Sequence, residues 1–282
     1  MMNTEQTPPP EVLGSPSCCG SLDLRLGCCM DVMKTFADGY FDLAIVDPPY
    51  GIRVGDNKQG MGRRKGVARA TYKMGDWDHE APPVEYFAEL RRVSKHQIVW
   101  GANHFIERLP INSACWIVWD KMFSNEVSFA AAELAWTSFD STAKKFQCHP
   151  LQDGRIHPTQ KPVKLYDWLL STYAKPGQRV LDTHMGSGSI AIAAHYAGIH
   201  LTACEIDPDY FHAAKARISR ETAQMDFFIH HNQIAEPQAS LGESVGFSVS
   251  SACENGNLSS SSYYENVTTK NTWSDSLRVH AG

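Results

Sequence analysis

The sequence lacks several features that would each assign it to a particular class of protein. No stretch of its 282 residues approaches the roughly 18 to 20 consecutive apolar residues that cross a bilayer as a helix, so no membrane partner is predicted. Residues 1–17 do not combine a basic start with an apolar stretch, which argues against a secretory signal. None of the eight cysteines forms a Cys-x-x-Cys pair, which argues against a bound metal. These absences predict a cytoplasmic protein with reduced cysteines.

An excess of either charge sign is absent from most of the chain, although the formal net charge is −5. Residues 221–282 contain seven acidic and two basic residues, which leaves residues 1–220 neutral, with 24 of each sign. Within that neutral part, residues 51–75 carry seven basic residues against one acidic residue. Such a charge run is typical of a solvated loop, and it is also how a protein contacts a phosphate backbone. The basic residues are Arg53, Lys58, Arg63, Arg64, Lys65, Arg69 and Lys73.

Apolar runs of strand length alternate with helical patterns between residues 20 and 231. Several runs are apolar throughout, as in a sheet covered on both faces, and the alternation predicts an α/β fold with mostly parallel strands. Asp207 is expected to cap a helix, and Cys115 and Cys204 to lie in the core. The expected strands are 41–47, 96–100, 115–119, 132–138, 179–182 and 199–205, and the expected helices are 82–94, 161–174 and 207–220.

Four segments do not follow the alternation of strands and helices. Residues 1–19 are expected to be flexible, and the serine-rich residues 232–282 to form a disordered tail, because they contain few apolar residues. Residues 51–80 and 138–156 lie within the folded part and have irregular sequences. We expect these two to be insertions that are available to contact a partner.

A glycine-rich turn follows the expected strand 179–182, in RVLDTHMGSGSIAIAAHYAG at 179–198. Gly186 and Gly188 allow a tight turn and a close ligand, and the helix that follows presents free N–H groups. Glu205 ends the next strand, about 20 residues after the glycines, where nucleoside-binding folds place a carboxylate for the ribose. A third glycine is lacking, so a dinucleotide site is disfavoured. The combination predicts an adenosine-containing ligand, while the turn alone could be purely structural.

The stretch AIVDPPYGI at 44–52 ends an apolar strand in an unusual way. Suppose that the adenosine-containing ligand is S-adenosylmethionine, which carries a methyl group on a positive sulfonium. An exocyclic amine of a nucleobase is a poor nucleophile because its lone pair is delocalised into the ring. Two hydrogen-bond acceptors directed at its N–H groups would free that lone pair to accept the methyl group. Asp47 offers a carboxylate, and Pro48 offers a carbonyl that Pro49 holds in an extended conformation. Tyr50 offers a flat ring against which an extruded base can stack.

These motifs together resemble those of the amino-group DNA methyltransferases. Asp47 to Tyr50 looks like the catalytic motif of that family, residues 182–188 are similar to its cofactor motif, and IHPTQKPVKL at 156–165 resembles its third motif. The catalytic motif comes first, as in the permuted beta group of these enzymes. The resemblance covers roughly residues 22 to 220. One departure is Thr183-His184 where the family usually has Pro-Phe, and His184 is expected to fill the packing place of the aromatic ring.

The resemblance implies a Rossmann-like methyltransferase fold with a seven-stranded sheet, helices on both faces and a circularly permuted order. Residues 22–36 then begin with the strand that neighbours the Glu205 strand. It also implies a catalytic domain at 20–231 that binds S-adenosylmethionine. The cofactor-binding residues that it implies are Asp182, Met185, Gly186, Ser187, Gly188, Glu205, Ile206, Thr159, Lys161 and Asp31.

Double-stranded DNA is the substrate that the resemblance implies, with adenine N6 as the target because the catalytic motif begins with Asp47. Methylation of cytosine N4 or of an RNA amine needs the same residues and stays open, as does an inactive DNA-binding relative. Gly101 to Asn103 and Trp77-Asp78 are candidates to line the base pocket, whereas His149 and His157 are expected to be structural. Neither a homodimer nor a partner restriction endonuclease is decided by the sequence.

Overall fold

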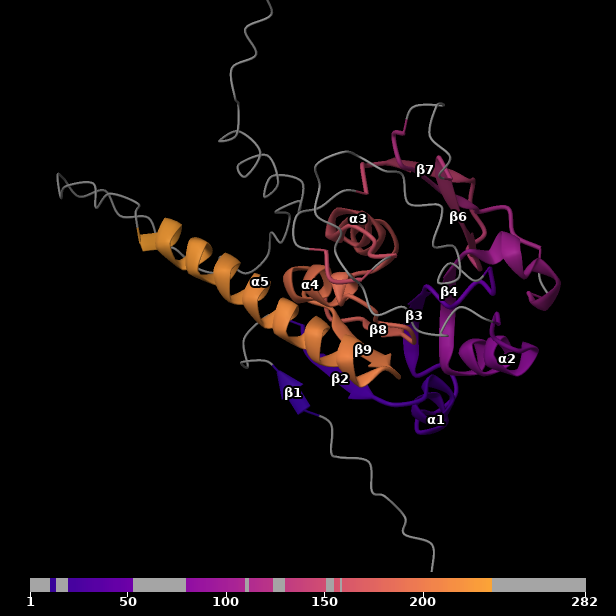
Figure 1. The fold of residues 1–282 in the computed structure, drawn as a ribbon, viewed down its shortest axis with the longest axis horizontal. Coiled ribbons are helices and arrows are strands. Elements are labelled where there is room, and N and C mark those ends of the chain that lie inside the picture. Colours follow the sequence, from indigo (N-terminus) through magenta and orange to yellow (C-terminus); the bar gives the residue numbers. More distant parts are fainter. Residues whose placement is uncertain are drawn as a thin grey trace, which may run out of the picture. The chain divides into compact units, whose positions relative to one another are not determined.

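The computed structural model describes residues 11–13, 20–52, 80–109, 112–123, 130–150, 155–157 and 159–234. The chain divides into two compact units, Met1–His230 and His231–Gly282. The described strands form one nine-stranded sheet in the order β1-β2-β9-β8-β3-β4-β6-β5-β7 (Figure 1). None of the described helices is long and apolar enough to cross a membrane.

Five neighbouring strands make up the parallel part of the sheet, as the sequence predicted. Four of them are buried along most of their length, because helices cover both faces. The first of the five pairs with the strand that ends at Glu205, so the expected permuted arrangement is confirmed. In sheet order they are β2 (Leu22–Leu26), β9 (His200–Glu205), β8 (Arg179–Asp182), β3 (Phe41–Val46) and β4 (Ser94–Trp100).

The two edges of the sheet differ from the prediction, because nine strands are present rather than seven. β6 (Ala132–Thr137) runs antiparallel to β4, and β5 (Ile117–Asp120) runs antiparallel to β6. The additional strands are β1 (Glu11–Leu13), antiparallel to β2, and β7 (Lys144–Gln147), parallel to β5. β7 lies within the segment 138–156 that was expected to be irregular. Its one large apolar residue, Phe146, stacks on Trp168 with ring centroids 4.9 Å apart, a contact that no local pattern shows.

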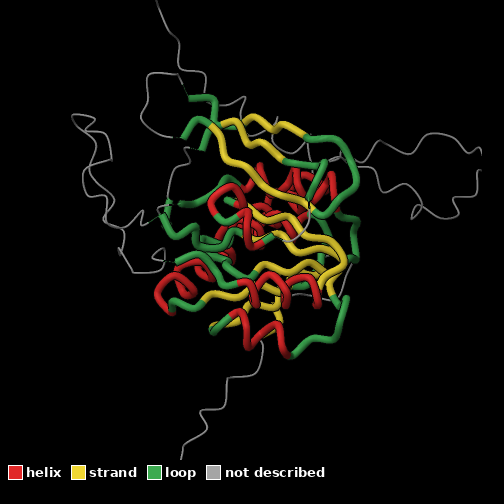
Figure 2. The backbone as a smooth tube through the Cα atoms, turned by 90° about the vertical axis from the view of Figure 1, so that its right-hand side faces the viewer, coloured by secondary structure: helices red, strands yellow, loops and turns green. Residues whose placement is uncertain are grey.

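Alternate residues of the central strands supply two hydrophobic clusters, one on each face of the sheet. Leu43 and Ile45 of β3 belong to a cluster that includes residues of α3, α4 and α5. Ala44 and Val46 belong to a second cluster that includes residues of α1 and α2. Figure 2 shows the strands side by side with helices packed against them. The helices are α1 (Cys29–Lys34), α2 (Val84–Val93), α3 (Val163–Tyr173), α4 (Ser189–Tyr196) and α5 (Pro208–Ile234), with 3₁₀ turns η2 (Ala102–His104) and η3 (Ile106–Arg108).

Details of the helices confirm one prediction and correct another. Asp207 caps α5, because its Oδ1 accepts the backbone N–H groups of Asp209 at 2.8 Å and Tyr210 at 3.2 Å. The helix continues to Ile234 rather than ending near residue 220, since no glycine or proline interrupts residues 209–234. Cys115 and Cys204 are fully buried, as expected for core residues.

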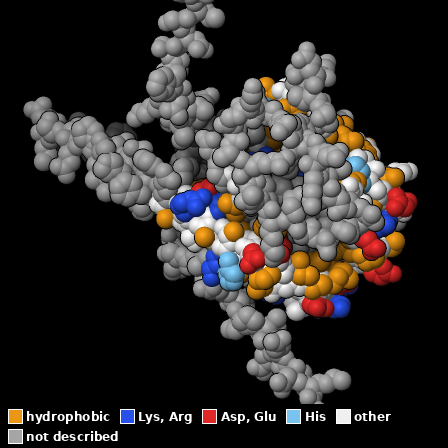
Figure 3. Space-filling view, in the orientation of Figure 1, with side chains coloured by type: hydrophobic (Ala, Val, Ile, Leu, Met, Phe, Trp, Pro, Cys, Tyr) orange, Lys and Arg blue, Asp and Glu red, His pale blue; other side chains and the backbone are white. Residues whose placement is uncertain are grey.

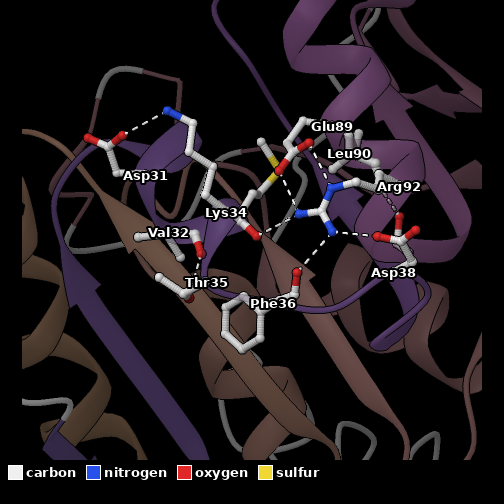
Figure 4. A network of polar contacts seen from close by, with 11 residues as sticks. Asp31, Val32, Lys34, Thr35, Phe36, Asp38, Glu89, Leu90 and Arg92 are labelled. Carbon is white, nitrogen blue, oxygen red and sulfur yellow. Dashed lines mark hydrogen bonds and ion pairs between the residues drawn. The ribbon is translucent and has the colours of Figure 1, made fainter.

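Arg92 of α2 joins two helices through one guanidinium group (Figure 4). It donates to the carbonyl of Met33 at the end of α1 and to that of Phe36 just beyond it, at 3.2 and 2.9 Å. It also pairs with Glu89 at 2.6 Å and Asp38 at 2.7 Å. The guanidinium therefore gives the Met33 carbonyl a donor in addition to the backbone N–H of Phe36 at 3.0 Å, and it links α2 to the end of α1.

Replacing Arg92 by methionine is expected to lower the melting temperature of the protein by a few degrees. The apolar replacement keeps the approximate length of the side chain but removes the donors to the Met33 and Phe36 carbonyls and the ion pairs with Glu89 and Asp38. Circular dichroism would measure the shift, with Arg91→Met as the matched loss of one positive charge on the same helix. Equal melting temperatures for the two variants would show that the contacts of Arg92 add no stability.

Candidate active site

Three carboxyl groups lie at the ends of three adjacent parallel strands. Asp47 follows β3, Asp182 ends β8 and Glu205 ends β9. Because the carboxyl ends of parallel strands meet at one edge of a sheet, these residues share the edge where α/β folds bind ligands. Burial, together with the negative charges of Asp47 and Glu205, raises the pKa of Asp182 to about 8. The three groups are therefore close enough to interact.

The Asp47 carboxylate is held at both of its oxygens. The Tyr50 hydroxyl donates to Oδ1 at 2.7 Å, and the Lys161 ammonium donates to Oδ2 at 2.6 Å. Burial and the charge of Asp47 raise the pKa of Tyr50 well above its ordinary value, so the phenol keeps its proton and remains a donor. Each carboxylate oxygen retains an acceptor position for a further donor.

The ammonium of Lys161 connects Asp47 to two residues that the sequence analysis missed. Lys161 is 4% exposed, and its Nζ also lies 3.0 Å from Oε2 of Glu133. Glu133 in turn pairs through Oε1 with Lys121 at 2.6 Å. Burial would raise the pKa of Glu133, but the two ammonium groups outweigh it and hold the pKa well below its ordinary value. The available signal was a single acidic residue within the otherwise apolar run 132–136.

The ring of Tyr50 is packed between residues that follow β4. The His104 ring lies nearly parallel to it, with centroids 5.2 Å apart and an interplanar angle of 16°. Gly101 has a left-handed φ of 70°, and a Cβ there would lie 2.0 Å from the Tyr50 ring. Only glycine therefore fits at residue 101. Of the suggested pocket residues, Gly101 is beside Tyr50, and a base stacked on the face next to His104 would have to displace that side chain.

Glu205 organises the glycine-rich turn through backbone donors. Its Oε2 accepts the N–H of Gly186 at 2.9 Å, and its Oε1 accepts those of Ile206 and Asp207 at 3.0 Å each. Among the described residues, the nearest atom to a Cβ built on Gly186 is the His184 carbonyl oxygen at 3.9 Å, so these residues leave this side of the turn open. At Gly188 a Cβ would lie 2.7 Å from Ile218 of α5, which explains the second glycine.

The other predicted cofactor residues fall into two groups. The first group lies at the glycine-rich turn that Glu205 contacts: Asp182 precedes the turn, and the buried Met185 and Ser187 are part of it. Ile206 directly follows Glu205 at the end of β9. Three others are engaged elsewhere. The Thr159 hydroxyl contacts Nδ1 of His157 at 3.0 Å, Lys161 pairs with the two carboxylates, and the exposed Asp31 pairs with Lys34 at 3.3 Å.

His184 packs as an aromatic residue would at this position. Its ring meets that of Tyr86 edge to face at 5.6 Å, and its Nδ1 contacts the Thr183 hydroxyl at 2.9 Å. Burial lowers the pKa of His184 to about 4, so the imidazole is neutral near pH 7. A neutral, partly buried ring that packs against Tyr86 fits the expected structural role.

The predicted DNA-contacting residues Arg53, Lys58, Arg63, Arg64, Lys65, Arg69 and Lys73 lie outside the described residues, as do Trp77 and Asp78 and the tail beyond residue 234. Within the described part of the chain, His, Cys, Asp and Glu side chains form no cluster of three or more that could hold a metal ion.

Comparison with known proteins gave one family and several relatives. Residues 95–216 match the family model described as DNA methylase. The chain is 26% identical over 213 residues to "Putative methylase YubD" of Escherichia coli (strain K12), covering 68% of this chain and 88% of that protein. It is 23% identical over 244 residues to the type II methyltransferase M2.MboI of Moraxella bovis, covering 70% and 87%. Among solved structures, the PvuII DNA methyltransferase (cytosine-N4-specific) is similar with a TM-score of 0.48 and 12% identity over 72% of this chain and 90% of that one.

Proposed function

We propose that this chain, whose residues 95–216 match the DNA methylase family model, transfers a methyl group from S-adenosylmethionine to an exocyclic amine in DNA. The match includes two of the three sequence motifs, at 156–165 and 182–188, and supports the resemblance that they indicated. We assign the reaction to residues 20–231 and take N6 of adenine as the target, because the catalytic motif begins with Asp47. N4 of cytosine is the alternative. The observation that carries the proposal is the Asp47 carboxylate, held at both oxygens at the same sheet edge as Glu205.

The residues at this edge fit the cofactor. Glu205 uses three acceptor positions for backbone N–H groups, which leaves one for a ribose hydroxyl. Gly186 is open on one side, so a ligand can approach the backbone there. The Glu205 carboxylate, which has no cation partner among its hydrogen bonds with the described residues, contributes negative charge to this edge, which suits a positively charged ligand. When bound, S-adenosylmethionine supplies the electrophilic methyl group on its sulfonium.

Asp47 and Pro48 carry the chemistry that belongs to the chain itself. The Asp47 carboxylate and the Pro48 carbonyl accept hydrogen bonds from the two N–H groups of the target amine. This makes the lone pair of the amine nitrogen available. Tyr50 and Lys161 keep the carboxylate oriented before the amine arrives. When the nitrogen gains the methyl group it releases one proton, and Asp47 is positioned to accept it. No covalent bond to the enzyme is required.

DNA contacts are assigned to the basic residues between 53 and 73, which supply positive charge for the phosphate backbone. On the face shown in Figure 3, the described residues carry basic, acidic and apolar side chains interspersed with one another. The target base would leave the duplex stack at a cost of a few kcal/mol before it reaches Asp47. The segment 138–156, which contains β7, is a second candidate for contact with DNA.

The experiment that tests this function incubates the protein with methyl-labelled S-adenosylmethionine and unmethylated DNA. Hydrolysis and mass spectrometry then identify the labelled nucleoside. Labelled N6-methyladenine is the expected product. Labelled N4-methylcytosine would keep the mechanism and change the base. The absence of label from DNA, with the cofactor bound, would reject DNA methylation and direct the search to RNA.

Replacing Glu205 by glutamine is expected to weaken cofactor binding roughly tenfold to a hundredfold, the loss typical of a hydrogen bond to a charged group. Isothermal titration calorimetry with S-adenosylmethionine measures the change. Glu89→Gln is the matched control, because it also removes one ion-paired carboxylate, which pairs with Arg92 of α2 and is not bound to the glycine-rich turn. Melting temperatures are measured alongside, since the amide also alters the turn at Gly186. Equal affinities for wild type and Glu205→Gln would remove Glu205 from the cofactor site.

A further inference from the structure

Four charged side chains of alternating sign form a series that begins just after β5 and ends at the catalytic motif. Lys121 pairs with Glu133 at 2.6 Å, Glu133 with Lys161 at 3.0 Å, and Lys161 with Asp47 at 2.6 Å. We call Lys121, Glu133, Lys161 and Asp47 the charge tetrad. They come from four places in the fold: after β5, within β6, before α3 and after β3. The family motifs contain only the last two of these residues.

Lys161 is the central member of the tetrad and is almost completely buried. Its ammonium donates hydrogen bonds to Asp47 at 2.6 Å and to the Tyr50 hydroxyl at 3.3 Å. It also forms an ion pair with Oε2 of Glu133 at 3.0 Å. An ammonium with three fixed partners has one orientation, so it holds the Asp47 oxygen in one place. Two carboxylates and two ammonium groups also make the tetrad neutral, which limits the cost of burying it.

Other groups that face Lys161 do not replace Glu133. The Trp100 ring lies 5.4 Å from its Nζ, and this contact carries no formal charge. Tyr166 keeps its proton because burial and the nearby carboxylates raise its pKa. His157 is neutral because burial, and then the charges of Lys161 and Arg155, lower its pKa to about 4. Asp182 is mostly protonated near pH 7. Among the described residues, Glu133 is therefore the one other anion that is ion-paired with Lys161.

We propose that Glu133 is a positioning residue of the methyl-transfer reaction, which acts through Lys161 to fix the orientation of the Asp47 carboxylate. This inference rests on the proposed function. If Glu133 loses its charge, Asp47 is the one carboxylate that remains paired with Lys161. The ammonium is then no longer fixed from the other side and can move together with the Asp47 carboxylate. Burial then opposes the charge of Lys161 with less compensation, so the ammonium loses its proton at a lower pH and Asp47 loses its partner.

The first test compares Glu133→Gln with wild type in methyl transfer as a function of pH. We expect kcat at neutral pH to fall by up to about a hundredfold, the size of effect that misplacing a catalytic group causes. The KM for the cofactor should stay unchanged. The variant should also lose activity as the pH rises, over a range in which wild type is constant, because two carboxylates raise the pKa of Lys161 in wild type. Glu133→Asp restores the charge and should restore the alkaline activity.

The matched control is Glu89→Gln, which removes a carboxylate that is paired with Arg92 at 2.6 Å and does not belong to the charge tetrad. Its pH profile should follow that of wild type. A purely structural role for Glu133 would lower the yield or the melting temperature and leave the shape of the pH profile unchanged. A profile of Glu133→Gln that parallels wild type at every pH would therefore overturn the inference.

A second measurement does not depend on activity. Lysine labelled with ¹³C at the ε carbon gives an NMR signal for Lys161, assigned by its loss in Lys161→Met, whose chemical shift follows protonation. We expect the Lys161 signal to titrate at lower pH in Glu133→Gln than in wild type. The same titration in both proteins would overturn the inference whether or not the enzyme is active. If wild type methylates no DNA, the proposed function fails, and this titration still decides whether Glu133 controls Lys161.

Discussion

Replacing Asp47 by asparagine is expected to reduce methyl transfer by at least about 10²–10³-fold, the cost of removing one preorganised electrostatic partner from an active site. Asparagine has the shape of aspartate but lacks its charge, so it accepts a hydrogen bond from the target amine more weakly. One of its two terminal atoms is an N–H donor, which would face either Tyr50 or Lys161. Cofactor binding should change little, because the ligands assigned to the cofactor lie on β8, β9 and the glycine-rich turn.

Asp42→Asn is the matched control for this change. Asp42 lies in the same strand, β3, and pairs with Lys95 at 2.7 Å and with the backbone N–H of Arg179 at 3.0 Å. The control thus removes an ion-paired aspartate near the opposite end of that strand. Labelled nucleoside yields measure transfer, and calorimetry measures cofactor affinity. Normal transfer by Asp47→Asn would exclude Asp47 from catalysis, and joint loss of transfer and affinity would indicate a structural role.

The parallel part of the fold was predictable because each strand carries its own signal. The runs 41–47, 179–182 and 199–205 are apolar on both faces, and Asp47, Asp182 and Glu205 mark their carboxyl ends. Parallel strands bring such ends together without any further information. The edges of the sheet were harder, since β7 has only four residues and its Phe146 packs against Trp168 of another element.

The contacts within the site were less predictable than its motifs. The resemblance placed Lys161 near the cofactor, whereas the structure pairs its ammonium with Asp47, which is 114 residues away in sequence. Glu133 was read only as part of an apolar strand, because a single sequence does not show which buried cation it meets. His104 likewise gave no local signal, although its ring lies against Tyr50.

Replacing Lys161 by methionine is expected to abolish methyl transfer and to lower the free energy of unfolding by about 3–5 kcal/mol near pH 7, because a buried ion pair then loses one partner. Methionine fills a similar volume, but Asp47 and Glu133 are left facing each other without the cation between them. Lys95→Met is the matched control. Its pair with Asp42 is half exposed, so its loss should cost no more than about 1 kcal/mol.

The pH dependence of this stability difference gives the sharper test. In wild type the folded pKa of Lys161 is raised, so its contribution is complete below the ordinary lysine value of about 10.4 and is lost as the pH rises through the folded pKa. The folded pKa of Glu133 is lowered, so its contribution is present above its ordinary value and is lost only as the pH falls well into the acid range. In Lys161→Met, Lys121 is the one ammonium group that still opposes the effect of burial on Glu133, so we expect the folded pKa of Glu133 to rise. The folded variant then takes up a proton as the pH falls, and this uptake stabilises it.

Urea unfolding at pH 5, 7 and 9 measures the free energy of unfolding of wild type and Lys161→Met. The gap between these two free energies should be large at pH 7 and 9 and smaller at pH 5. The gap for Lys95→Met should be small at all three. A gap for Lys161→Met that does not change with pH would mean that lost packing, rather than two uncompensated carboxylates, causes the instability. The catalytic motif would then keep its orientation without the ammonium, and the loss of Lys161 should leave measurable methyl transfer.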